Sequence, residues 1–276
     1  MKNKIYQIYY SNKTKFENDQ GFLQLDNLDN ERPDWREYWP IRKYLLNNQL
    51  EDDTRYGFLS PKFKEKTGLE ASSVESFIEN DDSDVVIFSP YFDQSALNFN
   101  VFEQLEEAHP GSVGIADKCL KEIYPEVNIF TMLMDTRSTV FCNYFVAKKT
   151  FWTNWLACCE KIFILAENNG SELAKALNSN VEHDNGIAPL KVFVIERVAS
   201  LLIEKESIKA KTFNSIQFQM GNKIWEDFRG ELVILDALKI ACKSNGFENY
   251  IKVFDLERVK LLKMVKDQIA VAHNKK

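Results

Sequence analysis

Apolar residues recur along the chain with two periods, one typical of strands and the other of helices. Residues 4–10 alternate between apolar and polar side chains, which predicts a first strand. The segment 84–90 begins with one aspartate, continues with an apolar run and ends in proline, as expected for a strand buried on both faces. The predicted strands are residues 4–10, 84–89, 127–134, 140–147 and 216–220.

Helical spacing of apolar positions, at steps of three and four residues, separates these strands. The predicted helices are residues 40–45, 72–78, 97–108, 150–166, 190–204, 231–243 and 256–273. Ser72 and Glu75 have the spacing of a capping box, and Thr150 can cap the helix that follows it. Strands that alternate with helices predict an α/β fold with a mainly parallel, or mixed, sheet flanked by helices. We expect one domain over residues 1–220 and a C-terminal helical extension over residues 221–276.

Composition adds that the chain is globular and predicts where it is found. Of its 276 residues, 45% are hydrophobic and 20 are Phe, while only 10 are Gly and 7 are Pro. The N-terminus lacks the apolar run of a signal peptide, and no window reaches the roughly 18–20 apolar residues that span a bilayer. The five cysteines have no Cys-x-x-Cys spacing. We therefore expect a cytoplasmic protein with reduced cysteines.

Charge is distributed unevenly and bears on the choice of partner. The net charge is −6, and residues 67–117 contain no Lys or Arg. Because nucleic-acid binding depends on neutralising phosphates, this acidic body predicts no nucleic-acid partner. The predicted helix 256–273 places Leu261, Leu262 and Val265 on one face with lysines interspersed. Such a helix either docks on the protein or makes peripheral contact with the inner face of the membrane.

Several common catalytic motifs are absent from the sequence. It contains no Gly-x-Gly-x-x-Gly, Walker loop, Gly-x-Ser-x-Gly or His-Glu-x-x-His. Three scattered histidines cannot supply a His-rich zinc site. The remaining interpretation is chemistry by polar side chains at strand ends, where open α/β sheets bind ligands.

The segment from Arg55 to Thr67 is the first candidate for such a site. Tyr56 and its aromatic neighbours alternate with cations, among them Lys62 and Lys66. Aromatic rings can stack on a base and ammonium groups can neutralise a diphosphate. The alternative is a solvated loop whose aromatic side chains anchor it to the core.

Three further candidates lie in or after predicted strands. Asp93 comes after the strand 84–89, where it could bind a metal diphosphate or a hydroxyl, or cap the next helix. Asp135 and Arg137 join two predicted strands and could bind a sugar or phosphate, or form an ion pair in an ordinary turn. Asn143 is polar in an apolar strand, so it either faces a ligand or is satisfied within the core.

Glu196 and Arg197 are the only charges in the apolar run 192–203. Neighbours on a helix point about 100° apart, so each group needs its own partner or a polar cleft. A carboxylate in apolar surroundings has a raised pKa, which suits a general base. The alternative is a structural network of ion pairs.

The segments Cys142–Leu156 and Glu196–Leu202 together resemble bacterial polysaccharide glycosyltransferases of the GT-A kind, over roughly residues 5–205. The resemblance implies a GT-A-like fold and transfer of a sugar from a nucleotide-sugar donor to a glycan or lipid-linked acceptor, in synthesis of capsule or lipopolysaccharide. It implies that Asn143 touches a sugar and that Glu196 is the base or positions the acceptor.

The sequence departs from that resemblance at the expected metal site. Asp82-Ser83-Asp84 is an Asp-x-Asp, but it precedes its strand instead of following it. Mn or Mg would then be held by Asp93 or Asp135, or the enzyme works without metal. Two other interpretations stay open: a non-catalytic accessory protein that binds carbohydrate or nucleotide, and a nucleotidyltransferase.

Overall fold

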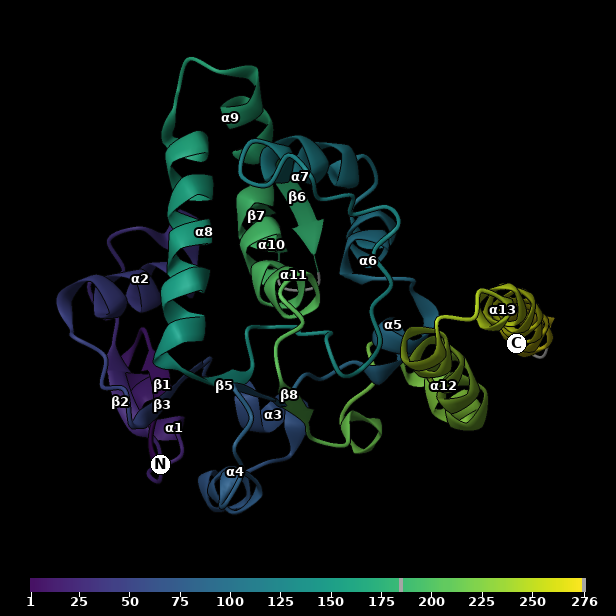
Figure 1. Cartoon of the computed structure of the whole chain (residues 1–276), viewed down its shortest axis with the longest axis horizontal. Coiled ribbons are helices and arrows are strands. Elements are labelled where there is room, and N and C mark those ends of the chain that lie inside the picture. Colours follow the sequence, from purple (N-terminus) through teal and green to yellow (C-terminus); the bar gives the residue numbers. More distant parts are fainter. Residues whose placement is uncertain (184–185, 275–276) are drawn as a thin grey trace.

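A six-stranded mixed sheet lies at the centre of the computed structural model, which describes residues 1–183 and 186–274 (Figure 1). The strand order is β2-β1-β3-β5-β4-β8. Five strands are parallel, and β5 is antiparallel to both of its neighbours. The strands are β1 (Lys2–Tyr9), β2 (Leu23–Asp26), β3 (Thr54–Leu59), β4 (Val85–Ile87), β5 (Phe145–Lys148) and β8 (Ala210–Thr212). The predicted α/β class with a mixed, mainly parallel sheet is confirmed.

Helices, short 3-10 turns and a separate pair of strands make up the rest of the described chain. The helices are α1 (Asn12–Glu17), α2 (Tyr38–Asn47), α3 (Phe63–Thr67), α4 (Ala71–Ile78), α5 (Phe92–Leu97), α6 (Val101–Ala108), α7 (Ser112–Lys121), α8 (Lys149–Glu167), α9 (Glu172–Leu177), α10 (Leu190–Glu196), α11 (Val198–Lys205), α12 (Arg229–Asn245) and α13 (Asn249–Asn274). The 3-10 turns are η1 (Pro33–Trp35), η2 (Ser215–Gln217) and η3 (Lys223–Phe228). Strands β6 (Asn180–His183) and β7 (Gly186–Pro189) pair with each other.

The two faces of the sheet are buried in different cores, and the strands supply them alternately. In β4, Val85 and Ile87 belong to the larger core, together with residues of α8 and α11. Val86, between them, belongs to a smaller core with residues of α3 and α4. Figure 1 shows α8 on one side of the sheet and α4 on the other. Burial on both faces explains why the β4 sequence is continuously apolar.

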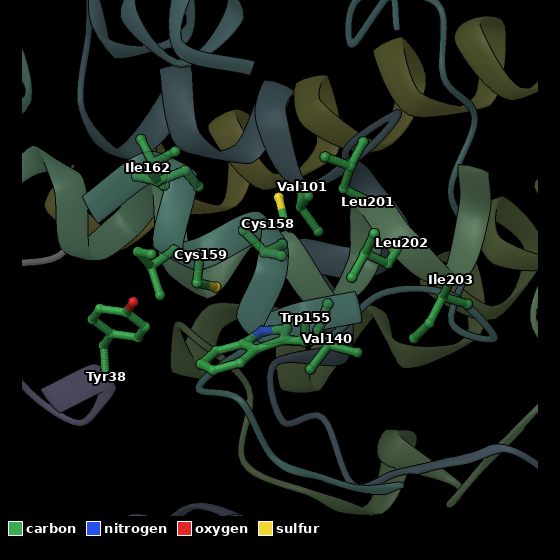
Figure 2. Packing of buried hydrophobic residues seen from close by; sticks show 14 of the residues in the cluster. Tyr38, Val101, Val140, Trp155, Cys158, Cys159, Ile162, Leu201, Leu202 and Ile203 are labelled. Atoms are coloured by element: carbon green, nitrogen blue, oxygen red, sulfur yellow. The ribbon is translucent and has the colours of Figure 1, made fainter. Parts of the chain in front are cut away.

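The larger core depends on close packing between α8 and α11. Trp155, Cys159 and Ile162 of α8 are fully buried, as is Leu202 of α11. Figure 2 shows Val140 beside the Trp155 ring in this cluster. The helical spacing predicted for residues 150–166 is thereby confirmed, and the buried thiols are reduced core residues.

Two predicted strands are wrong. The segment 127–134 is a loop. The side-chain amide of Asn100, just before α6, donates to the loop carbonyls of Ile129 (2.8 Å) and Met132 (2.7 Å). Because the amide side chain satisfies these backbone groups, apolar residues are buried there without a strand. The segment 216–220 begins in η2, where the Asn214 side chain accepts from the amide of Ile216.

Several predicted boundaries are also corrected. The strand predicted over 140–147 begins only at Phe145. Helix α4 starts after Glu70 with no side-chain cap, and α8 starts at Lys149, so neither Ser72 nor Thr150 caps a helix. The helix predicted over 190–204 is two helices, separated at Arg197.

The C-terminal helices α12 and α13 pack beside α5 at one end of the molecule (Figure 1). A third core joins them, with Phe92 of α5, Leu232 of α12 and Phe254 of α13 buried together. The face predicted for residues 256–273 divides: Leu261 and Val265 are buried, while Leu262 and Ile269 are exposed. Within residues 1–183 and 186–274, no helix is long and apolar enough to cross a bilayer.

Candidate functional site

A cavity of about 1170 Å³ lies along the edge of the sheet where the parallel strands end. The segments after β1, β2, β3 and β4 contribute Tyr10, Asn27, Ser60 and Tyr91 to its wall. Because β5 runs antiparallel, the residues before it meet the same edge, and Cys142 also lines the cavity. This is where open α/β sheets bind ligands.

Five of the predicted site residues line this cavity, although they come from three distant parts of the sequence. They are Lys62, Lys66, Asp93, Glu196 and Arg197. Helix α3, directly after β3, positions the two lysines, and α5 carries the aspartate. The junction between α10 and α11 supplies the other two. The structure therefore brings together positive and negative groups at the strand ends.

Lys66 is half-buried in the cavity wall. Its Nζ donates to Sγ of Cys142 at 3.1 Å and lies 5.4 Å from the ring centre of Tyr91 and 5.9 Å from that of Tyr144. Across the described part of the chain, no carboxylate forms an ion pair with this ammonium group. A cation held by aromatic rings and a thiol retains the capacity to bind an anionic ligand.

Glu196 is the last residue of α10, and its carboxyl group is desolvated by the protein around it. Burial raises its pKa; Arg197 opposes this shift, Glu37 adds to it, and Lys66 opposes it. The side chain of Glu196 forms no hydrogen bond or ion pair with residues 1–183 or 186–271. A carboxylate with a raised pKa and free acceptor sites can take a proton from a bound hydroxyl group.

Arg197, in contrast, is fully engaged with the protein. Its Nε donates to the carbonyl of Val101 (2.8 Å), Nη1 to that of Phe193 (2.7 Å), and Nη2 to Oε1 of Gln104. Burial lowers its pKa to about 10. The expectation that Glu196 and Arg197 each need their own partner is confirmed for Arg197. The guanidinium fixes the break between α10 and α11 against α6, which orients the preceding glutamate.

Asp93 holds a neighbouring loop and does not cap a helix. Helix α5 begins at Phe92 after Tyr91, whose φ is 65°, so Asp93 lies within the first turn. Its Oδ1 accepts from the amide of Gly221 at 2.8 Å, and the side chain is almost fully buried. Burial raises its pKa, against the effect of the backbone amides. The capping interpretation is wrong, and Asp93 links α5 to the segment before η3.

Asp135 and Arg137 lie away from the cavity wall. Asp135 is completely buried, and its Oδ2 lies 2.7 Å from Nη2 of Arg137 and 3.7 Å from Nζ of Lys243. Burial would raise the pKa of Asp135, but the hydrogen bond from Arg137 and the charge of Lys243 reverse that effect and lower it. The geometry is that of the ion-paired turn, the alternative that the sequence left open.

Tyr56 and Asn143 are likewise placed apart from the cavity. The Tyr56 ring is in the core, where its hydroxyl accepts from the amide of Glu51 at 2.9 Å. Asn143 is in the left-handed region (φ 54°) just before β5, and its buried Oδ1 has no hydrogen-bond partner among the residues described. Its neighbour Cys142 reaches the cavity wall in its place. The expectation that Asn143 and Glu196 face one pocket is therefore corrected.

The carboxylates proposed as metal ligands do not fit a divalent cation. Asp93 is buried against backbone amides, and Asp135 is already paired with two cations. In the part of the chain that the structure describes, no group of three or more His, Cys, Asp or Glu side chains is arranged to hold a metal ion. Asp82 and Asp84 lie before the N-terminal end of β4, on the opposite side of the sheet from the cavity edge, and pair with Lys209 and Lys148.

Sequence reasoning missed the strained backbone of the cavity wall. Asn30, Arg36, Tyr91 and Cys142 all line the cavity with positive φ, although none is glycine. Such conformations cost about 1–3 kcal/mol each and persist where the surrounding structure enforces them, often at functional sites. Only Asn30 carries a residue type that hints at this backbone conformation.

The chain was compared with models of protein families, with curated proteins and with solved structures. None of the three comparisons found a match.

Proposed function

We propose that this protein is a glycosyltransferase that moves a sugar from a nucleotide-sugar to a glycan or lipid-linked acceptor in bacterial surface polysaccharide synthesis. One observation carries the proposal: Lys66, with no carboxylate partner among the residues described, and Glu196, with a desolvated carboxyl group, line one cavity at the strand ends. An anion-binding cation and a base in one cavity match the two requirements of the reaction.

The donor diphosphate is assigned to the Lys66 side of the cavity. Lys62 stands on the same segment and adds a second positive charge to the wall. A volume of about 1170 Å³ exceeds the roughly 300–1,000 Å³ of common small-molecule pockets, which leaves room for donor and acceptor together. Ammonium groups bind phosphate as point charges, so these lysines can neutralise a leaving diphosphate without the metal pair.

Glu196 is assigned to the acceptor. Its carboxylate takes the proton from the acceptor hydroxyl as that oxygen forms a bond to the anomeric carbon. The bond from that carbon to the diphosphate oxygen breaks, and the nucleoside diphosphate leaves with the electron pair. Because general bases of this kind contribute about 10²–10⁴-fold to rate, Glu196→Gln should lower transfer by that factor.

The test is a panel of nucleotide-sugars, assayed by thermal shift and by release of nucleoside diphosphate, with and without manganese. We expect a donor that stabilises the wild type and fails to stabilise Lys66→Met. Lys64→Met is the matched control, since Lys64 lies on the same helix but is exposed and paired with Glu70 at 2.7 Å. If no nucleotide or nucleotide-sugar stabilises the wild type, the proposal is wrong.

A non-catalytic accessory protein is the second candidate, favoured by the unsuitability of the two predicted metal ligands. It predicts that a nucleotide-sugar or glycan binds and that no transfer or hydrolysis accompanies binding. A nucleotidyltransferase, the other interpretation, predicts release of pyrophosphate instead of a nucleoside diphosphate. Product analysis of the same assay therefore separates the three.

A further inference from the structure

Helix α13 has an outer face that combines exposed apolar side chains with lysines. Two adjacent stripes along the helix make up this outer face: Lys252, Leu256, Val259, Lys263 and Lys266, and beside them Val253, Lys260, Met264, Asp267 and Val271. Leu256 is 62% exposed and Val259 is 66% exposed, and the other members are exposed as well. Single exposed apolar residues are ordinary, but five exposed on one side of a single helix are not.

The orientation of α13 is fixed by its opposite face. Phe254, Leu261 and Val265 are buried against α5 and α12. Arg258 also donates to Oε1 of Glu103 on α6 at 2.9 Å. Since these contacts hold the inner face, the outer face is directed away from the part of the protein that the structure describes. Figure 1 places this helix at the end of the molecule farthest from β1 and β2.

The composition of the outer face indicates the kind of surface that it contacts. It carries four lysines and one aspartate among five apolar side chains, and the half-buried Glu257 lies on the second stripe between Val253 and Lys260. Lys260 pairs with Glu257 at 2.6 Å, but exposed pairs at this spacing are weak. A second copy of the same face would bring like charges together, which opposes self-association. Apolar side chains interleaved with lysines suit an anionic bilayer, where the apolar groups enter the interface and the ammonium groups reach the headgroups.

We propose that α13 seats the protein on an anionic lipid surface through this outer face. The inner face of the same helix, with Val265 and Ile269, forms one end of the cavity together with Trp225. This end is apolar, whereas the sheet edge of the cavity is charged. One consequence follows, and it rests on the proposed glycosyltransferase function. The acceptor is lipid-linked, with its apolar part at the α13 end of the cavity and its hydroxyl group toward Glu196.

Vesicle flotation of the full chain tests the lipid contact without any enzymatic assay. We expect the wild type to float with vesicles of phosphatidylcholine and phosphatidylglycerol, to stay behind with phosphatidylcholine alone, and to be released by salt. Each lysine near an anionic surface contributes about fivefold in affinity, so Lys263→Gln with Lys266→Gln should weaken binding roughly 25-fold. Leu256→Gln with Val259→Gln should weaken it by at least about tenfold.

The matched control is Val233→Gln with Ile234→Gln, which removes two exposed apolar side chains from α12 and should leave flotation unchanged. Thermal unfolding of each variant checks that the fold is intact. Equal behaviour of the wild type with neutral and anionic vesicles would overturn the proposal, as would a dimer that the Leu256 and Val259 substitutions abolish while vesicles go unbound. If a donor binds but the protein does not float, the lipid contact is wrong and the proposed transferase function is unaffected. If the protein floats but no donor binds, the lipid contact is supported and the proposed transferase function is wrong.

Discussion

At the scale of single residues, the desolvated carboxylate of Glu196 lowers the free energy of unfolding. Its pKa is raised above the unfolded value of 4.5, so the folded state resists ionisation of this group more than the unfolded state does. The penalty is fully present above the folded pKa and disappears as pH falls toward 4.5. We expect Glu196→Gln to raise the free energy of unfolding at neutral pH by about 1 kcal/mol.

Denaturant titrations of the wild type and Glu196→Gln at several pH values provide the measurement. The gain should shrink as the pH is lowered through the raised pKa. Glu172→Gln is a suitable control, because Glu172 is highly exposed on α9, where it pairs with Lys175. A variant that is less stable than the wild type at neutral pH would show that Glu196 is a structural partner instead.

For Asp135 we predict the opposite effect on stability: its ionised carboxylate stabilises the folded state. Its pKa is lowered below 3.8, so its stabilising charge is present above that pH and is lost as pH falls through the folded pKa. Breaking a buried ion pair from one side costs about 3–5 kcal/mol, and we expect a loss of that size for Asp135→Asn at neutral pH. Asp52→Asn, at a pair with 91% exposure of the aspartate, should cost less than about 1 kcal/mol.

Ligand binding distinguishes a structural Asp135 from a functional one. Because Asp135 lies outside the cavity wall, donor binding by Asp135→Asn should match the wild type at temperatures where the variant is folded. Loss of binding with retained folding would return Asp135 to the site. The same comparison for Asp93→Ala should show weakened binding, since the loop at Gly221 would lose the side-chain oxygen that accepts from its amide.

At the scale of elements, the sheet depends on a glycine that no periodicity reveals. A Cβ on Gly57 would lie 2.8 Å from Cγ2 of Val146 and 3.2 Å from Cγ2 of Ile5, on the two strands beside β3. We expect Gly57→Ala to destabilise the protein by about 2 kcal/mol through overpacking. Gly230→Ala, in open space near the start of α12, should be neutral or stabilising by up to about 1 kcal/mol.

The elements that the sequence predicted correctly are those whose burial follows one period. Strand β4 and helix α8 have long or continuous apolar patterns, and both were predicted at nearly their observed positions. Residues 127–134 are equally apolar but form a loop, because Asn100, a long way back in the chain, satisfies two of their carbonyls. A partner that distant is invisible to a local pattern.

The candidate site was predictable where burial and charge conflict within one segment. Glu196 stood out as a charge in an apolar run, and the structure places it in the cavity. Glu37 did not stand out, because it precedes α2 in an ordinary polar stretch and meets Glu196 only through the fold. Asn143 was misjudged because a left-handed turn, and not a strand, holds it.

At the scale of the whole molecule, Lys239 joins the C-terminal helices to the rest of the fold. Its buried Nζ, on α12, donates to the carbonyls of Ser95 and, at 2.7 Å, Asn98, at the end of α5. Residues of α5, α12 and α13 also share one apolar core. We therefore expect residues 221–276 to unfold in the same cooperative transition as the remainder, with coincident changes in tryptophan fluorescence and circular dichroism.

The protonation of Lys239 gives this joint its own pH dependence. Burial lowers its pKa to about 8, below the unfolded value of 10.5. The folded state then binds this proton less tightly than the unfolded state does, so the cost of the charge is fully present below about pH 8 and is removed as pH rises toward 10.5. Lys239→Met carries no such group. The stability of the wild type relative to this variant should therefore increase between about pH 8 and 10.5, as measured by denaturant titration, and a difference that stays flat across that window would show that Lys239 is not desolvated at the joint.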